Sequence, residues 1–277
     1  MGFPLREGRP NMNREGGSAT ALGADRVLAL RADGVSVRFG SFLPVNGVTL
    51  HLDVGARQAL VGPNGAGKTT LINLLTGVLR PTAGAIRIGD QDVTGWSSDR
   101  RARFGLARTF QVNTLFPSLT VLQSTILAIA ERSGRGAVWW RSLDRCVDLR
   151  DEAIDLLTEL HLERQADTCV RELPYGKQRL MEIALALAAR PRVLLLDEPA
   201  AGVPEGEREE LFDVINSLDS RISVLFIEHD MDLVFRFARR ISVLVGGTLL
   251  TEGTPEEIAR NQKVREVYLG DTDVHAA

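Results

Sequence analysis

A glycine-rich stretch, "GPNGAGKT" (62–69), has the residue types and spacing of a phosphate-binding loop. Its three glycines let the backbone turn inward, so that several N–H groups can point at phosphate oxygens. An apolar segment precedes the loop and a segment with helical spacing follows it, so a helix N-terminus adds partial positive charge. We expect Lys68 to bridge the β- and γ-phosphates of a nucleotide, and Thr69 to bind Mg²⁺ through its hydroxyl. The alternative is a glycine-rich turn that contains a lysine by chance.

Two carboxylates end a later apolar segment, "RVLLLDEP" (192–199). Continuous apolarity at strand length favours a parallel strand buried on both faces, and open α/β sheets bind ligands at the carboxyl ends of such strands. We expect Asp197 to hold Mg²⁺ in the nucleotide complex, and Glu198 to orient and deprotonate a water facing the γ-phosphate. The alternative, a surface Asp-Glu pair at a strand end, is weakened by the phosphate loop in the same chain.

Three more residues could contact the nucleotide. His229 ends the apolar segment "FIEHD" (226–230), where it could hydrogen-bond the γ-phosphate or be only a satisfied polar residue. Gln111 closes "RTFQ" (108–111) and could reach the metal or the attacking water, although on the residues alone it is merely polar. Phe39 ends an alternating segment and could stack on a base, although an isolated aromatic there is more often a core residue.

The surrounding pattern predicts an α/β core with a helical insertion. Two segments alternate like half-buried strands, and two continuous apolar runs indicate parallel strands separated by a helical segment. Residues 112–190, which precede the two continuous apolar runs, have apolar residues mainly at helical spacing. The expected strands are 35–39, 48–54, 57–62, 85–89, 193–197 and 222–230, with a hairpin over 240–253 that turns at Gly246-Gly247. The expected helices are 69–79, 205–218 and most of 112–190.

Composition limits the classes of function. The chain has 277 residues, which allows about one or two domains, and its 44% apolar and 25% charged residues are typical of a globular protein with a core. A net charge of -3 argues against a nucleic-acid partner. The two cysteines lack neighbours at ligand spacing and indicate ordinary thiols in a reducing compartment.

The N-terminus lacks the apolar stretch of a secretory signal, and no apolar run approaches the roughly 18 residues that span a bilayer. We therefore expect a cytoplasmic protein. Residues 1–28 are rich in Gly, Arg and Asn, so we expect a disordered extension there, with Met12 as an alternative start.

Taken in order, the motifs resemble those of the ATP-binding cassette (ABC) ATPases. The matching features are Phe39, "GPNGAGKT", Gln111, "LPYGKQR", "LLLDEP" and His229, and the resemblance covers residues 29–270. "RTFQ", "YGKQRLMEIA", "DEPAAGV", "IEHDMDLV", "GTPEEI" and "VYLG" are similar to importer subunits of the branched-chain amino acid type. The resemblance implies a P-loop NTPase (RecA-like) core with an antiparallel β subdomain, an inserted α-helical subdomain at about 112–190, and a tail at 271–277.

The resemblance also implies a role for each matching residue. Phe39 would stack on adenine, Gln111 would sense nucleotide, metal and permease, Asp197 would hold Mg²⁺, Glu198 would be the catalytic base, and His229 would be the γ-phosphate switch. The phosphate cradle would be Gly62, Pro63, Asn64, Gly65, Ala66, Gly67, Lys68, Thr69 and Thr70. The signature segment, which closes over ATP bound by a partner subunit, would be Leu173, Pro174, Tyr175, Gly176, Lys177 and Gln178.

Two prolines depart from the family pattern. Pro174 stands where the signature usually has serine, and proline offers neither a hydroxyl nor a backbone N–H to a γ-phosphate. Pro204 stands where the loop after the carboxylates usually ends in aspartate, which weakens any assignment of a carboxylate contact across a dimer.

The resemblance thus implies an ATP- and Mg²⁺-dependent ATPase on the inner face of the membrane. Its expected partners are a second ATPase subunit, identical or different, two membrane permeases and, indirectly, a periplasmic binding protein. The leading hypothesis is an importer for branched-chain or related amino acids. The alternatives are urea, amide or aromatic-acid substrates, a soluble non-transport ABC protein, a homodimeric exporter ATPase, and a phosphate-loop enzyme outside the family.

Overall fold

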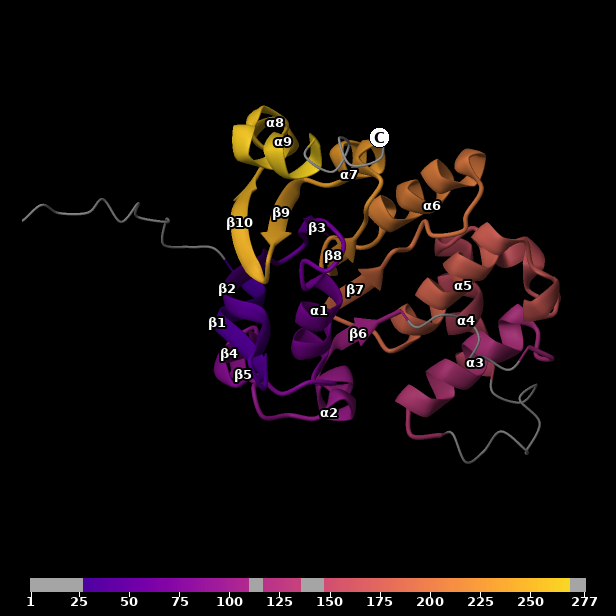
Figure 1. The fold of residues 1–277 in the computed structure, drawn as a ribbon. Helices are drawn as coiled ribbons and strands as arrows, with labels where there is room; N and C mark the ends of the chain where they lie inside the picture. The colour runs from indigo at the N-terminus through magenta and orange to yellow at the C-terminus, as the bar shows by residue number, and fades with distance from the viewer. Residues whose placement is uncertain (1–26, 110–116, 136–146, 270–277) are drawn as a thin grey trace, which may run out of the picture.

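The computed structural model describes residues 27–109, 117–135 and 147–269, which form two sheets and the helices around them (Figure 1). Gln111, most of the expected N-terminal extension and the tail at 271–277 lie outside these residues. No helix among the described residues is long and apolar enough to cross a membrane.

The larger sheet has six strands in the order β10-β9-β3-β8-β7-β6. Neighbouring strands pair in parallel from β9 to β6, and β10 joins β9 as an antiparallel hairpin. The expected parallel strands and the expected hairpin are therefore confirmed. The strands are β3 (Arg57–Val61), β6 (Leu106–Arg108), β7 (Val193–Asp197), β8 (Ser223–Ile227), β9 (Arg240–Val245) and β10 (Thr248–Gly253).

Both faces of this sheet are buried, because an apolar core packs against each face. Successive side chains of one strand point to opposite faces and so enter different cores. Leu194, Leu196 and Phe226 belong to the apolar core that includes helices α5 to α7. Val193 and Leu195 belong to a second core, shared with α1 and the smaller sheet. Two-sided burial explains why these strands read as continuous apolar runs.

The smaller sheet is antiparallel, with strands in the order β2-β1-β4-β5. The strands are β1 (Leu28–Phe39), β2 (Phe42–Asp53), β4 (Ala83–Ile88) and β5 (Gln91–Asp92). Leu28 is thus in the sheet, not in the N-terminal extension where the sequence placed it. The alternative that Phe39 is a core residue is also wrong. Phe39 is 51% exposed, because the chain leaves the sheet at once in a left-handed turn at Gly40.

The helices fall in two groups. Three of them, inserted between β6 and β7, lie away from the smaller sheet (Figure 1) and share a small apolar core that includes Ile129, Ala153 and Ala188. They are α3 (Val121–Arg132), α4 (Val147–Glu159) and α5 (Tyr175–Ala188), with 3₁₀ turns at Glu163–Gln165 and Val170–Glu172. The others are α1 (Lys68–Thr76), α2 (Ser98–Arg103), α6 (Glu205–Ser217), α7 (Met231–Phe237), α8 (Pro255–Arg260) and α9 (Gln262–Leu269). The expected helical insertion is confirmed for its described residues.

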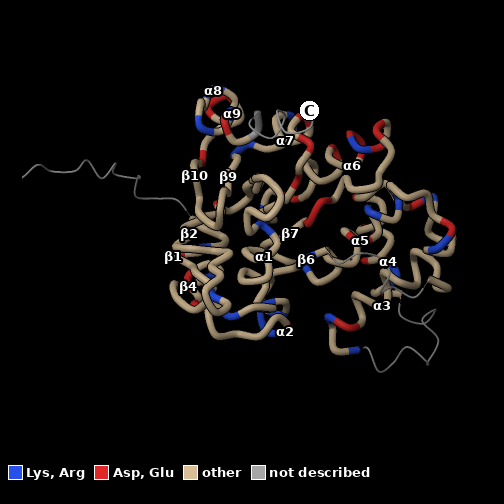
Figure 2. Tube along the Cα trace, in the orientation of Figure 1, with Lys and Arg blue, Asp and Glu red and all other residues tan. Residues whose placement is uncertain are grey.

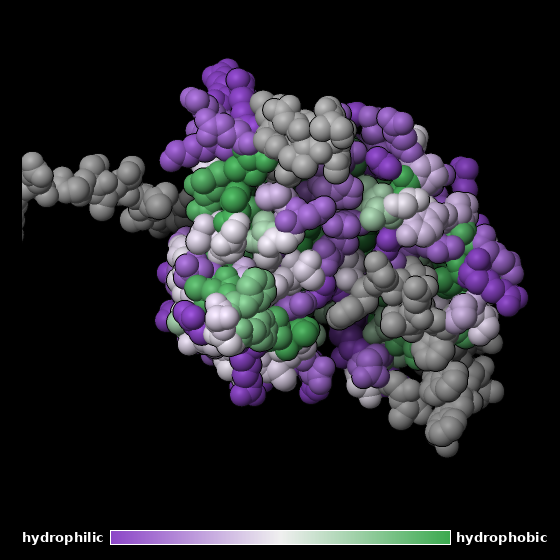
Figure 3. Space-filling view, viewed as in Figure 1, coloured by the Kyte–Doolittle hydropathy of each residue, from purple (hydrophilic) through white to green (hydrophobic). Residues whose placement is uncertain are grey.

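On the face of the molecule seen in Figure 3, hydrophobic surface gathers on the side of β1 and β2, and hydrophilic surface covers α8. Phe39, the last residue of β1, and Phe42, the first residue of β2, form an exposed aromatic pair.

Candidate functional site

The motif residues follow the C-terminal ends of three neighbouring strands in the larger sheet. β8 lies between β3 and β7, and Ile227 is in register with both Leu60 and Asp197. The phosphate loop after β3, the carboxylates at the end of β7 and His229 after β8 therefore emerge side by side. Figure 2 shows this closeness as a basic segment at the start of α1 near an acidic segment at the end of β7.

The phosphate loop is braced by two other parts of the chain. Gly67 precedes α1 with a φ of 100°, and a Cβ there would lie 2.2 Å from the carbonyl oxygen of Pro44 in β2. The N–H of Gly247, in the β9–β10 turn, donates to the carbonyl of Ala66 at 3.0 Å. At Gly67, only glycine fits the positive φ and the close approach to Pro44. Asn64, Gly65 and Thr69 are exposed, so the outer surface of the loop faces solvent.

The other cradle residues differ in exposure. Gly62 and Ala66 are buried, whereas Pro63, Gly67, Lys68 and Thr70 are half-buried. The cradle thus has an exposed outer surface on a buried base.

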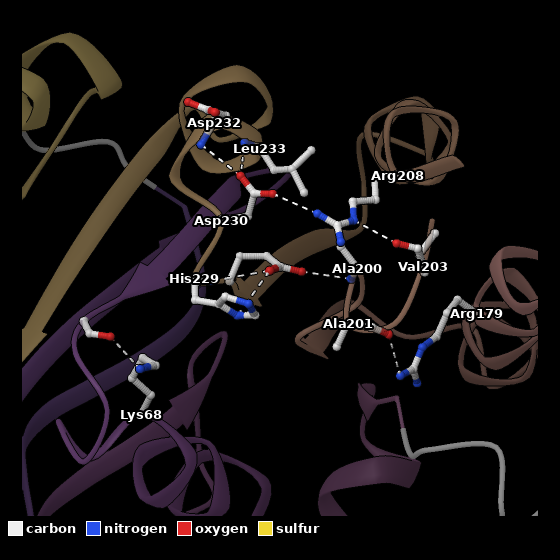
Figure 4. A network of polar contacts seen from close by, with 12 residues as sticks. Lys68, Arg179, Ala200, Ala201, Val203, Arg208, His229, Asp230, Asp232 and Leu233 are labelled. Carbon is white, nitrogen blue, oxygen red and sulfur yellow. Dashed lines mark hydrogen bonds and ion pairs between the residues drawn. The ribbon is translucent and has the colours of Figure 1, made fainter. Parts of the chain in front are cut away.

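Lys68 points its ammonium into the loop (Figure 4). Its Nζ donates to the carbonyl oxygens of Gly62 at 2.6 Å and Pro63 at 3.1 Å. Burial lowers the pKa of Lys68, and the charges of Glu198 and Asp197 act against that shift. The cation and the two carboxylates are therefore close enough to interact.

Asp197 is held by Arg108, a residue to which the sequence assigned no function. Arg108, at the end of β6, places Nη2 at 2.6 Å from Asp197 Oδ2 and donates from Nη1 to Asn73 Oδ1 at 2.8 Å. Asn73 lies on α1, one helical turn after Thr69. The guanidinium thus joins β6, β7 and the helix of the phosphate loop. Arg108 begins the segment "RTFQ", but nothing in that segment indicated its partner.

The oxygen donors fit a magnesium ion. The hydroxyl of Thr69 and the carboxylate of Asp197 are hard ligands of the kind that Mg²⁺ prefers. The described residues contain no group of three or more His, Cys, Asp or Glu that could hold a metal. Mg²⁺ is usually held by one or two protein oxygens together with substrate phosphates.

Glu198 lies in a strained conformation. Its φ is +49°, in the left-handed region that non-glycine residues seldom adopt. Its N–H donates to the carbonyl of Ile227 at 3.1 Å, and its own carbonyl accepts from the N–H of Ala201 at 3.0 Å. The backbone is thus fixed on both sides of the residue.

His229 is accessible, and the residue before it is not. The His229 side chain is 68% exposed, whereas that of Glu228 is 1% exposed. Glu228 accepts hydrogen bonds from the N–H groups of Ala200 at 2.9 Å and His229 at 3.3 Å. Sequence reasoning missed Glu228, although an acidic residue inside the apolar segment "FIEHD" was a visible signal.

The signature segment forms a turn that starts α5. Pro174 is the N-cap, and the first intrahelical bond runs from the N–H of Gln178 to its carbonyl at 2.9 Å. The preceding N–H groups, those of Tyr175, Gly176 and Lys177, have no partner within the helix. Leu173 anchors the turn in the core, and the Gln178 side chain donates to its carbonyl at 2.9 Å.

This segment is separate from the phosphate loop of its own chain. Tyr175 is 44% exposed, and Lys177 pairs with Glu210 of α6 at 2.9 Å. Among the described residues, the hydrogen bonds and ion pairs of residues 173–178 run to the helical region and α6, and none runs to residues 62–70. Pro204, the other departure from the family pattern, is the N-cap of α6. Both prolines thus start helices without a side-chain cap.

The structure does not test the roles of two further predicted site residues. Phe39 lies on the strand pair whose Pro44 braces the phosphate loop, and its role in adenine stacking stays a prediction. Gln111 lies outside the described residues. The chain approaches it along β6, where the N–H of Thr109 donates to the carbonyl of Leu195 at 3.1 Å.

Comparisons with known proteins agree with this geometry. A family model described as ABC transporter matches residues 45–201, and one described as branched-chain amino acid ATP-binding cassette transporter matches residues 248–274. The chain is 38% identical to the high-affinity branched-chain amino acid transport ATP-binding protein BraF of Pseudomonas aeruginosa, and 39% identical to LivG of Escherichia coli. Each alignment covers 87% of this chain and 98% of the relative.

Solved structures also match. The crystal structure of an ATP-binding cassette of an ABC transporter in its ADP conformation superposes with a TM-score of 0.78 at 29% identity, over 88% of this chain and 99% of that one. A nucleotide-free ATP-binding cassette gives a TM-score of 0.76 at 29% identity, over 87% of this chain and 98% of that one.

Proposed function

We propose a transport function for this chain, which belongs to the ABC transporter family and is an ATP-binding ATPase. The chain energises an importer, and the solutes that this importer transports are branched-chain amino acids. The main support for an ATPase site is that Lys68, Asp197, Glu198 and His229 come together at the C-terminal ends of three adjacent parallel strands.

Each side chain in this site has a proposed task. The backbone N–H groups of residues 64–70 and the ammonium of Lys68 bind the phosphates, and Phe39 stacks on the adenine. Thr69, Asp197 and Gln111 hold Mg²⁺, which neutralises phosphate charge when it is bound. Glu198 accepts a proton from the attacking water, and His229 hydrogen-bonds the γ-phosphate.

A second ATPase subunit completes each site. The free N–H groups at the start of α5 lie away from the phosphate loop of the same chain, which supports a role toward ATP bound by another subunit. Two subunits, identical or different, would enclose two ATP molecules. Because closure needs γ-phosphate between the two helix N-termini, ATP binding favours the closed state and hydrolysis reopens it.

The remaining partners are two membrane permeases, through which the chain lies on the cytoplasmic face of the membrane, and, indirectly, a periplasmic binding protein. An apolar cavity of about 340 Å³ supports a permease contact. It lies between α2 and α5, beside β6 and the residues that lead to Gln111, and Val78, Leu106 and Leu185 help to line it.

The names of the relatives and the C-terminal family match at 248–274 support branched-chain amino acids as the substrate. The experiment is to reconstitute the chain in liposomes with its permeases, its partner ATPase and the binding protein. We expect leucine, isoleucine or valine to stimulate ATP hydrolysis and to enter the liposomes. Stimulation by urea, short amides or aromatic acids instead would contradict the substrate, and failure to copurify with any permease would contradict the transport role.

A further inference from the structure

Three side chains from three elements hold the loop between β7 and α6, residues 198–203 (Figure 4). Glu228, after β8, accepts from the N–H of Ala200 at 2.9 Å. Arg179 of α5 donates to the carbonyl of Ala201 at 3.2 Å, and Arg208 of α6 donates to the carbonyl of Val203 at 2.8 Å. The loop that begins with Glu198 is therefore fixed by side-chain contacts along its length.

Arg208 also contacts the segment after β8, where its Nη1 lies 3.2 Å from Asp230 Oδ2. Glu228 differs from both arginines because it contacts the backbone of His229 itself. Its Oε1 accepts from Ala200, while its Oε2 accepts from the N–H of His229 at 3.3 Å. One carboxylate therefore joins the loop of Glu198 to the backbone of His229.

The position of Glu228 is unfavourable for a residue that only fills the core. The side chain is 1% exposed, and burial raises the pKa of its carboxyl while the two amide donors oppose the shift. A buried carboxylate is tolerated where its oxygens are hydrogen-bonded, as they are here. An apolar side chain would fill the same space without this desolvation.

Glu198 needs such support. Its left-handed backbone conformation is stable only where the surroundings determine it, and the Ala200 amide held by Glu228 is two residues further along the chain. Loss of this contact would release the turn on which the Glu198 carboxylate depends, without removing any group that contacts nucleotide.

We propose that Glu228 is a positioning residue for ATP hydrolysis, which fixes the backbones of Glu198 and His229 relative to each other. This inference rests on the proposed roles of those two residues. Glu228 itself contacts neither nucleotide nor attacking water in this account. It acts through its two amide partners and through the His229 ring, whose Nδ1 lies 3.9 Å from Glu228 Oε2.

The test is Glu228→Gln in the assembled transporter. Glutamine keeps one acceptor but presents an NH₂ group to the other amide, so one of the two contacts is lost. We expect kcat for ATP to fall about 10- to 100-fold, as for a misplaced catalytic group, while the Kd for ATP changes less than about threefold. In a Glu198→Gln background the same change should lower the residual rate by less than about twofold, because residues that act as a unit are not additive.

Glu252→Gln is the matched control. Glu252 is a largely buried carboxylate that contacts Gln58, Arg240 and Ser242, on the β10 side of the sheet. It should lower the melting temperature without lowering kcat. Glu228→Asp, which keeps both acceptors but moves them by one methylene, serves if the glutamine variant does not fold, and its kcat should fall at unchanged Kd.

Two results would overturn the proposal: a wild-type kcat in a folded Glu228 variant, or a fall in kcat that Glu252→Gln reproduces at the same loss of melting temperature. The proposed function fails separately. If Glu198→Gln alone hydrolyses ATP at the wild-type rate, the assignment of the base fails and the premise for Glu228 fails with it. A wild-type kcat in Glu228→Gln together with an inactive Glu198→Gln contradicts the proposal for Glu228 alone.

Discussion

Arg108 and Asp197 form an ion pair of 2.6 Å at the carboxyl ends of two adjacent strands, and both side chains are largely buried. The guanidinium thus occupies one oxygen of the carboxylate that we assign to Mg²⁺. It also contacts Asn73 on the helix that follows the phosphate loop. This arrangement ties Asp197, which we propose as a Mg²⁺ ligand, to the segment that leads to Gln111.

Arg108→Met should lower the thermal stability of the nucleotide-free chain more than that of the nucleotide-bound chain. Without its counter-charge the Asp197 carboxylate is poorly solvated, which should cost about 1–2 kcal/mol of stability after allowance for partial exposure. Bound Mg²⁺ would replace the missing charge, so the rise in melting temperature on adding Mg²⁺ and ADP should be larger in the variant than in the wild type. Thermal unfolding by circular dichroism measures both quantities.

Arg108→Lys is the control for charge, since it keeps a cation but loses the fixed fork that reaches Asn73 and Asp197 together. We expect it to fall between the wild type and the methionine variant. An identical Mg²⁺-ADP shift in all three proteins would argue against any link between Arg108 and the metal site.

Acid should destabilise the helical insertion through Glu152. Arg132 binds this carboxylate with two hydrogen bonds of 2.7 and 2.8 Å, and Arg190 adds a third at 3.0 Å. These contacts, above all those from Arg132, hold the pKa of Glu152 below its ordinary value of 4.5. A lowered pKa contributes stability that is fully present above about pH 4.5 and is lost as the pH falls through the folded-state value.

Glu152→Gln should therefore lower the melting temperature at pH 7 and flatten its decline between pH 5 and about pH 3. Glu159→Gln, an exposed residue of the same helix, should leave the wild-type pH profile intact. Equal slopes for the wild type and Glu152→Gln would show that this cluster does not govern acid stability.

Pro174→Ser tests whether the signature segment needs the hydroxyl that it lacks. The structure places Pro174 at the N-cap and leaves the next three N–H groups without partners in the helix. These backbone donors suffice in our account, so the ATPase rate of the assembled complex should stay within about twofold of the wild type. A missing donor to developing charge can cost roughly 3 kcal/mol, so a rise approaching about 100-fold would show that the hydroxyl was limiting.

The sequence predicts the central strands and the site edge well for a physical reason. Strands buried on both faces must be continuously apolar, and the segments 193–197 and 222–230 show this pattern clearly. Because parallel strands end at one edge, the positions of Asp197 and His229 follow from strand assignment alone. The three-residue strand β6 is too short to produce a pattern, and the sequence analysis missed it.

Side-chain partnerships could not be predicted in the same way. Arg108 and Asp197 are 89 residues apart, and Glu228 and Ala200 are 28 apart. No local period links such pairs, which meet only because their strands are neighbours in the sheet. The exposure of Phe39 was missed for a related reason, since alternation alone does not show where a strand ends.

The most direct test of the central claim, that this chain hydrolyses ATP with Glu198 as the base, is one measurement on Glu198→Gln in the assembled complex. ATP binding and hydrolysis are followed together with radiolabelled ATP. Glutamine keeps the size of the side chain but cannot accept the proton of the attacking water, so ATP should bind within about threefold of the wild-type affinity while hydrolysis falls at least about 100-fold. Hydrolysis at the wild-type rate would contradict the account.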